Sequence, residues 1–266
     1  MPDAAPAAPA PPPSVRVALE PRAGGTIARV TIDNAAKLNT LGSALMIAFV
    51  EAIEALGKRD DLRAVVLTGA GEKAFIGGAN IFEMATLDRD AAQAFITLVH
   101  RSCAALRDLP VPVIARVNGY ALGAGLEVAA ACDLRIASSS AVFGMPEVKV
   151  GIPSVVEAAL LPGLIGWGRT RELLLFGENI DAATALAWGL VEAVVAPGAL
   201  DAAIEARLKA LLACGAQAVR LQKALIRRWE DLTLSQAVQA GIESFAQAYA
   251  GDEPQRMMGA FTRRRG

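Results

Sequence analysis

Residues 117–127 have the sequence VNGYALGAGLE and join a predicted strand to a predicted helix. The strand is the apolar run over residues 111–117, and helical periodicity follows over residues 126–132. Small residues at the start of a helix leave its first backbone amides free to bind a negatively charged oxygen. Glu127 ends the stretch among apolar neighbours, so the segment combines amide donors with a candidate proton carrier.

A dinucleotide-binding loop is an alternative for this segment, because Gly119, Gly123 and Gly125 have a superficially similar spacing. That fingerprint requires GxGxxG between strand and helix, and an acidic residue after a second strand. Neither feature is present, which disfavours a Rossmann fold.

Two other segments place glycine or glutamate in similar surroundings. Residues 73–80, KAFIGGAN, follow a continuous apolar strand predicted over residues 64–68, and their paired glycines let a ligand approach the backbone. A plain strand-to-helix turn is the alternative.

Residues 142–147, VFGMPE, end in Glu147. Apolar surroundings raise the pKa of a carboxyl group toward neutrality, where it can transfer protons. Taken singly, either glutamate could instead cap a helix or form an ion pair.

Strand, turn and helix patterns repeat outward from these segments and predict an α/β fold. Further strands are predicted over residues 15–19, 26–32 and 134–137, and helices over residues 43–56 and 90–109. From residue 199 only helices are predicted, over residues 199–213, 216–229, 233–249 and 253–264. Their wide apolar faces need a partner, either the core of the chain or another subunit. We therefore predict a disordered Pro/Ala tail over residues 1–14, an α/β core with the active site over 15–198, and a helical oligomerisation region over 199–266.

Composition excludes several other classes of protein. A net charge of −1 gives no general attraction to nucleic acid, and no apolar stretch approaches the ~18 residues that span a membrane. The three cysteines are far apart, as is typical of reduced thiols in a cytoplasmic protein. His100 is the single histidine and has no companion ligands, so a partly buried surface histidine is favoured and no metal site is predicted.

Together, the three segments resemble the motifs of the crotonase (enoyl-CoA hydratase/isomerase) superfamily in order and separation. The resemblance extends from about residue 15 to the end of the chain and includes GLV at 189–191 and AFTRR at 260–264. It implies a crotonase fold of repeated β-β-α units with a C-terminal helical region. It also implies an acyl-CoA substrate, no cofactor beyond that coenzyme A, and a homotrimer or homohexamer.

The resemblance assigns roles to individual residues. The backbone amides of Ala79 and Ala124 would form an oxyanion hole for the thioester oxygen. Glu127 would hold and deprotonate water, and Glu147 would exchange the proton at C2. Because isomerases of the family usually keep only the acid at the position of Glu147, both glutamates together favour hydration of trans-2-enoyl-CoA. The alternatives are isomerase, dehalogenase or thioester hydrolase chemistry, or a non-catalytic CoA-binding member.

Further residues are expected to contact the acyl-CoA by the same resemblance. They are Ala36, Lys37, Leu38, Lys73, Gly77, Gly78, Asn80, Ile81, Gly123, Pro146, Phe261 and Arg264. Arginines near the C-terminus suit a phosphate group because guanidinium binds phosphate in a bidentate manner. A solubilising basic end is the alternative.

The sequence departs from the family in two places. Asn80 stands where an aspartate is usual. Residues 154–158, SVVEA, stand where hydratases usually have a glycine-rich run, and one residue is missing between Glu147 and Pro153. This departure makes Glu157 a third carboxylate without an assigned role.

Overall fold

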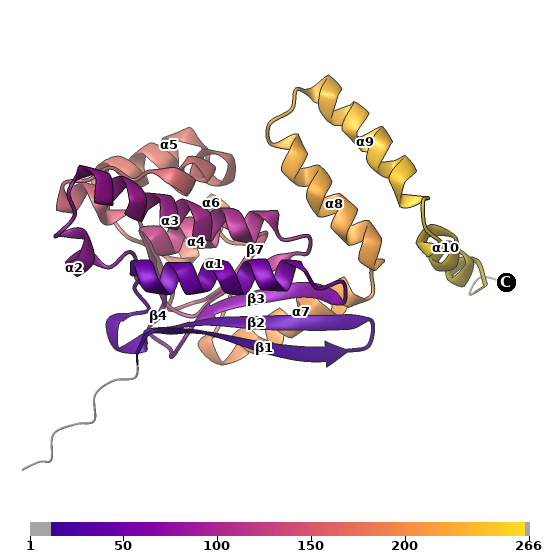
Figure 1. Cartoon of the computed structure of the whole chain (residues 1–266), viewed down its shortest axis with the longest axis horizontal. Coiled ribbons are helices and arrows are strands. Elements are labelled where there is room, and N and C mark those ends of the chain that lie inside the picture. The colour runs from indigo at the N-terminus through magenta and orange to yellow at the C-terminus, as the bar shows by residue number, and fades with distance from the viewer. Residues whose placement is uncertain (1–11, 264–266) are drawn as a thin grey trace, which may run out of the picture.

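Two β-sheets organise the chain in the computed structural model, and Figure 1 labels strands from each of them. The structure describes residues 12–263, and the side chains of residues 12–259. The larger sheet has six strands in the order β1-β2-β3-β5-β7-β10, with the first pair antiparallel and the others parallel. These strands are β1 (Ser14–Arg22), β2 (Gly25–Asp33), β3 (Leu62–Gly69), β5 (Val113–Val117), β7 (Leu134–Ser138) and β10 (Ala193–Val195). All five predicted strands are confirmed within it.

The smaller sheet has four short strands in the order β4-β6-β8-β9. They are β4 (Ala74–Ile76), β6 (Tyr120–Leu122), β8 (Val142–Gly144) and β9 (Ile180–Asp181). The first three each follow a strand of the larger sheet and precede helical segments, so the repeated β-β-α units are confirmed. Strands of two or three residues are too short to carry an alternating pattern, and the sequence did not predict them.

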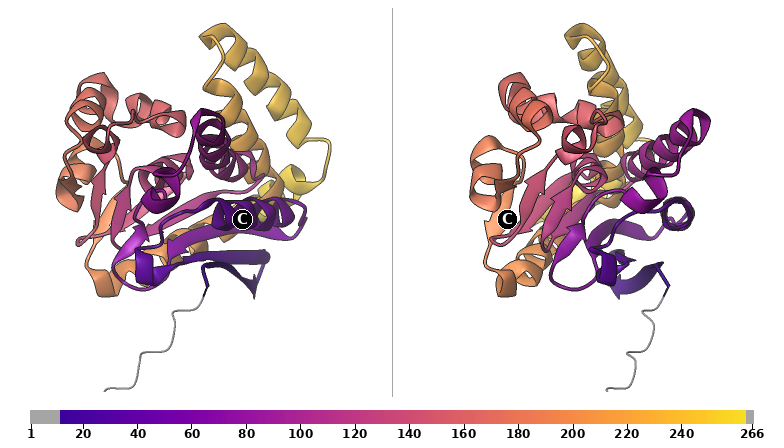
Figure 2. Two further views of the ribbon diagram at one scale, coloured as in Figure 1. Left: turned by 60° about the vertical axis from the view of Figure 1, so that its left-hand side comes forward. Right: turned by 90° about the vertical axis from the view of Figure 1, so that its left-hand side faces the viewer.

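Helices cover both faces of the larger sheet (Figure 2). Strand β3 shows why, because its alternate residues belong to two different clusters. Val65 packs in the cluster that includes α1 (Ser43–Gly57), α3 (Arg89–Asp108) and α4 (Ala124–Ala131). Val66 points the other way and packs against α7 (Leu200–Leu212). The prediction of a strand buried on both faces is confirmed. Three further helices are α2 (Ile81–Met84), α5 (Leu161–Phe176) and α6 (Ala182–Trp188).

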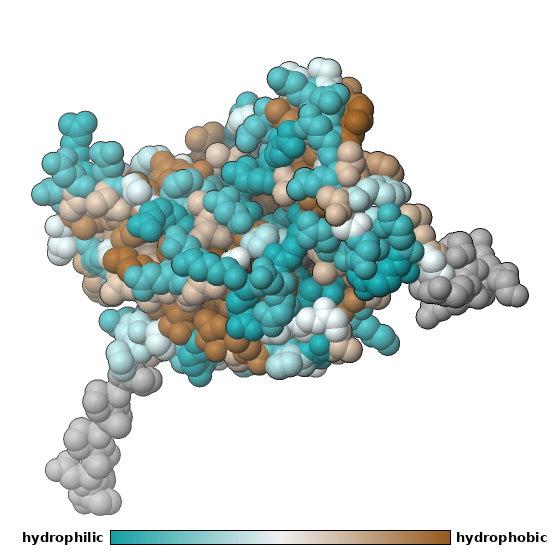
Figure 3. Space-filling view, turned by 45° about the vertical axis from the view of Figure 1, so that its right-hand side comes forward, coloured by the Kyte–Doolittle hydropathy of each residue, from teal (hydrophilic) through white to brown (hydrophobic). Residues whose placement is uncertain are grey.

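The C-terminal helices divide into two groups. Helix α7 buries its apolar side against the sheet, whereas α8 (Ala216–Trp229) and α9 (Leu234–Ala248) form a hairpin that projects from the core in Figure 1. Helix α10 (Glu253–Arg263) follows them. All four predicted helices are confirmed. On α9 the apolar side chains of Leu234, Val238, Ile242 and Phe245 are exposed, and apolar surface covers part of the projecting lobe in Figure 3. No helix of the described residues is long and apolar enough to cross a membrane.

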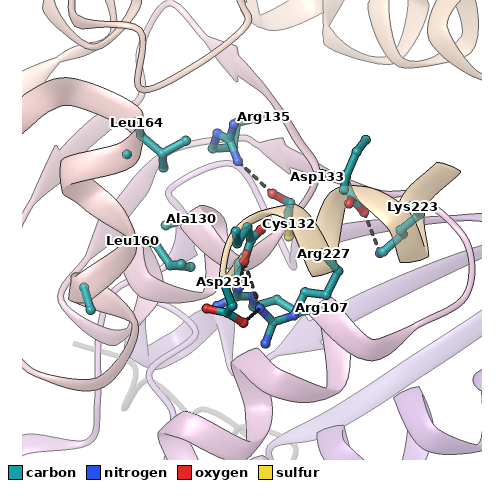
Figure 4. Close-up of a pocket in the computed structure, with 15 residues that line it drawn as sticks. Arg107, Ala130, Cys132, Asp133, Arg135, Leu160, Leu164, Lys223, Arg227 and Asp231 are labelled. Carbon is teal, nitrogen blue, oxygen red and sulfur yellow. Dashed lines mark hydrogen bonds and ion pairs between the residues drawn. The ribbon is translucent and has the colours of Figure 1, made fainter. Parts of the chain in front are cut away.

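Ion pairs fasten α8 to the core beside a cavity of about 720 Å³ (Figure 4). The Lys223 ammonium is buried, donates to Asp133 across 2.6 Å, and also donates to the carbonyl oxygen of Val111 across 2.9 Å. Near the other end of α8, Arg107 of α3 pairs with Glu230. The cavity lies between α8 and the core, and each of the four described cations that line it, Arg107, Arg135, Lys223 and Arg227, is paired with an acidic side chain.

Candidate active site

The first two glycine-containing segments lie side by side because β4 and β6 pair in parallel. The contact extends into α4, where a side chain on Gly125 would place its Cβ only 2.0 Å from the carbonyl oxygen of Ile76. Only glycine permits so close an approach. As a result, Ala79 near the end of one segment and Ala124 at the start of α4 in the other belong to one compact site.

The amides of Ala79 and Ala124 are the donors predicted for an oxyanion hole, and both are available in the described chain. Ala124 is the first residue of α4, so its N–H has no acceptor within the helix. Within the described chain, neither amide donates a hydrogen bond to another backbone group. The described non-glycine residues with positive φ are Leu38, Asn39 and Val156, so Ala124 keeps the negative φ that a donor in this position needs.

Glu147 lies over the start of α4, in the short helix η2 (Pro146–Val150). A Cβ on Gly123 would lie 2.3 Å from the Oε1 atom of Glu147, and the φ of Gly123 is +52°. The positive φ favours glycine at this position, and a Cβ there would also displace the Glu147 carboxylate. The other carboxylate oxygen, Oε2, accepts a hydrogen bond from the Ser154 hydroxyl across 2.8 Å. These two contacts orient the carboxylate.

Glu127 is the buried member of the pair. Its side chain comes from the first turn of α4, and the residue is 4% exposed. The Ala158 amide donates to its Oε1 atom across 3.3 Å. Burial above all, and then the charge of Glu147, raise the pKa of Glu127 to about 8, with Ala158 opposing the change and Glu157 adding to it. At neutral pH Glu127 therefore favours its protonated form in the free protein.

A cavity of about 290 Å³ gathers much of the predicted site. Its lining includes the predicted residues Gly77, Gly78, Ala79, Ile81, Gly123, Pro146 and Glu147. Glu127 and Ala124 are not part of this lining; they adjoin it through Glu147 and Gly123. The sequence did not single out the remaining lining residues, which are Thr40, Met84, Leu122, Lys149, Val150 and Ile152.

The predicted CoA-binding loop adjoins the same site. The carbonyl oxygen of Leu38 accepts a hydrogen bond from the Gly77 amide across 2.8 Å. The buried Asn39 side chain fixes the loop by donating to the carbonyl oxygens of Ala70 and Ala74 across 3.0 and 2.8 Å. Ala36 and Lys37, which precede Leu38, are exposed.

The remaining predicted contacts have different surroundings. Lys73 is exposed at the start of the first segment. Asn80 caps α2, because its side chain accepts a hydrogen bond from the Phe82 amide across 3.2 Å. The asparagine thus provides the capping acceptor that an aspartate would provide, without the charge. The side chain of Phe261 and the whole of Arg264 lie outside the described residues.

Two polar contacts of the glutamates were missed from the sequence, those from Ser154 and Ala158. The unusual sequence at residues 154–158 was the available signal for these contacts, although only the fold shows which carboxyl group each residue contacts. His100 is half exposed, as its surface placement predicted, and its Nδ1 atom lies 2.8 Å from Oε1 of Glu157. Among the described residues, no cluster of three or more His, Cys, Asp or Glu side chains could hold a metal ion.

The repeated β-β-α units bring the backbone amides of Ala79 and Ala124 beside the carboxyl groups of Glu127 and Glu147. Such a site is suited to the chemistry of a thioester enolate. A family model described as enoyl-CoA hydratase/isomerase matches residues 22–266. The short-chain-enoyl-CoA hydratase of Clostridium acetobutylicum is 36% identical over 242 residues, which cover 91% of this chain and 93% of that relative. The crotonyl-CoA hydratase of Syntrophomonas wolfei is 33% identical over 240 residues, covering 90% of this chain and 92% of the relative.

Solved structures agree with this similarity. The crystal structure of an enoyl-CoA hydratase from Bacillus anthracis matches with a TM-score of 0.88 and 30% identity, over 93% of this chain and 96% of that one. DspI of Pseudomonas aeruginosa matches with a TM-score of 0.87 and 32% identity, over 93% and 94% of the two chains. The chain therefore belongs to the enoyl-CoA hydratase/isomerase family, and the resemblance inferred from its sequence is confirmed.

Proposed function

We propose that this protein is an enoyl-CoA hydratase that reversibly adds water to trans-2-enoyl-CoA and gives 3-hydroxyacyl-CoA. The observation that carries the proposal is the coupled pair Glu127 and Glu147, placed beside the amides of Ala79 and Ala124. Two relatives at 36% and 33% identity bear the names short-chain-enoyl-CoA hydratase and crotonyl-CoA hydratase, which supports the same reaction.

The two amides supply the electrostatic part of the reaction. When water adds at C3, negative charge develops on the thioester oxygen as the enolate forms. Donors from Ala79 and Ala124 stabilise this charge more than the neutral carbonyl, and therefore lower the barrier. Loss of one such donor costs about 10²–10³ in rate in comparable sites.

The two glutamates supply the proton transfers. In dehydration, ionised Glu147 removes the proton from C2 while protonated Glu127 protonates the departing hydroxyl. Burial favours the protonated form of Glu127 in the free protein, which suits this direction, and the Ser154 hydroxyl donates to Oε2 of Glu147. Hydration uses the reverse arrangement, in which Glu127 accepts a proton from water and Glu147 delivers one to C2. A single proton shared by two carboxyl groups serves both directions.

This chemistry requires no cofactor beyond the coenzyme A of the substrate, because the chain itself supplies the oxyanion donors and the proton carriers. We place the CoA portion along the loop at residues 36–38, whose Leu38 carbonyl is bonded to Gly77 in the site. Lys73 and Arg264 would bind its phosphates.

Assembly into a trimer, or a dimer of trimers, is part of the proposal. The exposed apolar side of α9 supports it, because Val238, Ile242 and Phe245 are each more than half exposed, at 56%, 60% and 69%. Such a face in one subunit is normally covered by another. Three unpaired cysteines suit a reducing compartment, and we infer that the protein acts in the cytoplasm.

Loss of the absorbance of the conjugated thioester, measured with crotonyl-CoA and purified protein, tests the proposal. Activity should require both carboxyl groups, so Glu127→Gln and Glu147→Gln should each lower turnover by orders of magnitude. Binding of CoA should change little in either variant, because glutamine keeps the shape of the side chain. Near-normal hydration by either variant would exclude the two-carboxylate mechanism.

A further inference from the structure

Glu157 is a buried carboxylate that the proposed reaction does not use. It lies in the short helix η3 (Val156–Leu160) and is 5% exposed. Its Oε1 atom contacts Nδ1 of His100 across 2.8 Å, whereas its Oε2 atom has no hydrogen-bond partner among the described residues. A buried carboxylate oxygen without a donor is costly to a fold, so its presence requires an explanation.

The neighbours of Glu157 connect it to the catalytic pair. His100 and Cys103 lie one turn apart on α3 and both face Glu157, while Glu127 faces it from α4. Burial, together with the charge of Glu157, raises the pKa of the Cys103 thiol well above its usual range. The thiol therefore stays protonated and can donate a hydrogen bond toward the carboxylate.

A second connection runs through the backbone. Ala158 directly follows Glu157, and its amide donates to Oε1 of Glu127 across 3.3 Å. The position of η3 therefore determines where this donor points. The contact between His100 and Glu157 fastens η3 to α3, so it also fixes the donor that Glu127 receives.

We propose that Glu157 is a positioning residue for Glu127: His100 holds it as a buried anion, and it sets the orientation and protonation of Glu127 through the Ala158 amide and through its own charge. This inference deepens the proposed function and rests on Glu127 acting as a proton carrier.

The charge of Glu157 has a definite effect on Glu127. A nearby negative charge opposes a second one, so Glu127 keeps its proton to a higher pH than burial and Glu147 alone would allow. Once ionised, Glu127 is a stronger base toward water for the same reason. Neutralising Glu157 therefore shifts ionisation of Glu127 to lower pH and weakens it as a base.

His100 is the solvent-facing end of this arrangement, with its side chain 54% exposed. In the tautomer that carries a proton on Nδ1, the ring donates to Oε1 of Glu157, and such a donor stabilises the charged form of a buried carboxylate. Replacement by leucine removes the donor, so Glu157 would take up a proton or leave the interior. Replacement by asparagine retains an N–H near the position of Nδ1, without a titrating ring.

The test compares Glu157→Gln, His100→Leu and His100→Asn with the wild type, using the pH profile of kcat/KM for crotonyl-CoA. Glu157→Gln should move the high-pH limb to lower pH by about one unit, a common size for the effect of one neighbouring charge. His100→Leu should move it in the same direction, and His100→Asn should leave it close to that of the wild type. A purely structural role would lower the melting temperature without moving this limb.

A second measurement separates failure of this inference from failure of the proposed function. Carboxyl ¹³C NMR of glutamate-labelled protein, with the Glu127 signal identified by its loss in Glu127→Gln, follows the ionisation of Glu127 without any substrate. A midpoint that is the same in Glu157→Gln and wild type overturns the inference, whatever the activity. The midpoint could be lower in Glu157→Gln than in the wild type while the wild type fails to hydrate crotonyl-CoA. That result would support the coupling and overturn the hydratase proposal. If Glu157→Gln does not fold, the same titration of His100→Leu against His100→Asn decides the question.

Discussion

The hydroxyl of Ser154 donates to Oε2 of Glu147 across 2.8 Å, and so leaves Oε1 as the oxygen that faces Gly123 and the start of α4. The hydrogen bond joins the loop after η2 to a proposed catalytic group. It lies in the segment where the chain departs from the usual glycine-rich run of the hydratases. At this position the Ser154 side chain provides Glu147 with a hydrogen bond that a glycine has no side chain to make.

Ser154→Ala should therefore lower kcat for crotonyl-CoA by about tenfold, because a hydrogen bond to a charged group contributes roughly 1.5–3 kcal/mol. KM should change little, since the CoA loop at residues 36–38 is untouched. Ser154→Thr keeps the hydroxyl and should retain most of the activity. Steady-state kinetics of the three proteins check this, and an unchanged kcat in Ser154→Ala would show that the hydrogen bond does not matter.

The stability of the protein should depend on pH through Glu127. Its pKa is about 8 in the folded protein, against 4.5 for an ordinary glutamate. Between these values the folded state binds a proton that the unfolded state does not. The contribution of this group to the free energy of unfolding therefore falls as the pH rises from about 4.5 to about 8, by an amount on the order of a few kcal/mol.

Glu127→Gln lacks this ionisation and provides the matched comparison. The melting temperature of Glu127→Gln minus that of the wild type should increase as the pH is raised from 5 to 8, because only the wild type loses stability through Glu127 over this range. Thermal unfolding followed by circular dichroism at several pH values measures the difference. A constant difference across the range would mean that Glu127 ionises normally in the folded protein.

Proton exchange at C2 should survive the loss of Glu127. Removing the C2 proton needs only the oxyanion donors and one base, and Glu147 provides that base in Glu127→Gln. With saturated acyl-CoA in D₂O, this variant should incorporate deuterium at C2, as mass spectrometry would detect, whereas Glu147→Gln should not. Exchange that is absent in Glu127→Gln would move the role of the C2 base to another group, with Glu157 the first to examine.

The longer elements were predictable from the sequence because their pattern is local. The continuous apolar run at residues 64–68 lies within β3, and the stripe at residues 43–56 lies within α1. The smaller sheet was not predictable, since β4, β6 and β8 have three residues each and owe their existence to pairing with one another.

A residue of the candidate site was predictable from the sequence where a single short motif contains it. Glu127 lies in such a segment, and its flanking apolar residues indicated the burial that raises its pKa. The contact between His100 and Glu157 joins residues 57 positions apart, and no local pattern signals it. Ser154 and Ala158 likewise required the fold to bring η2 and η3 over α4.

Assembly should depend on the apolar side of α9. Val238 is 56% exposed and Ile242 and Phe245 lie on the same side of the helix, so Val238→Asp would place a charge in the proposed subunit contact. We expect light scattering to give a trimer or hexamer for the wild type and a smaller species for Val238→Asp. Gln247→Asp is the matched control, because it adds the same charge to an exposed position on the opposite side of α9, nine residues from Val238, and it should assemble normally. A wild type that remains monomeric at micromolar concentration would rule out the assembly, and equal dissociation of both variants would show that the effect is one of charge and not of the apolar side.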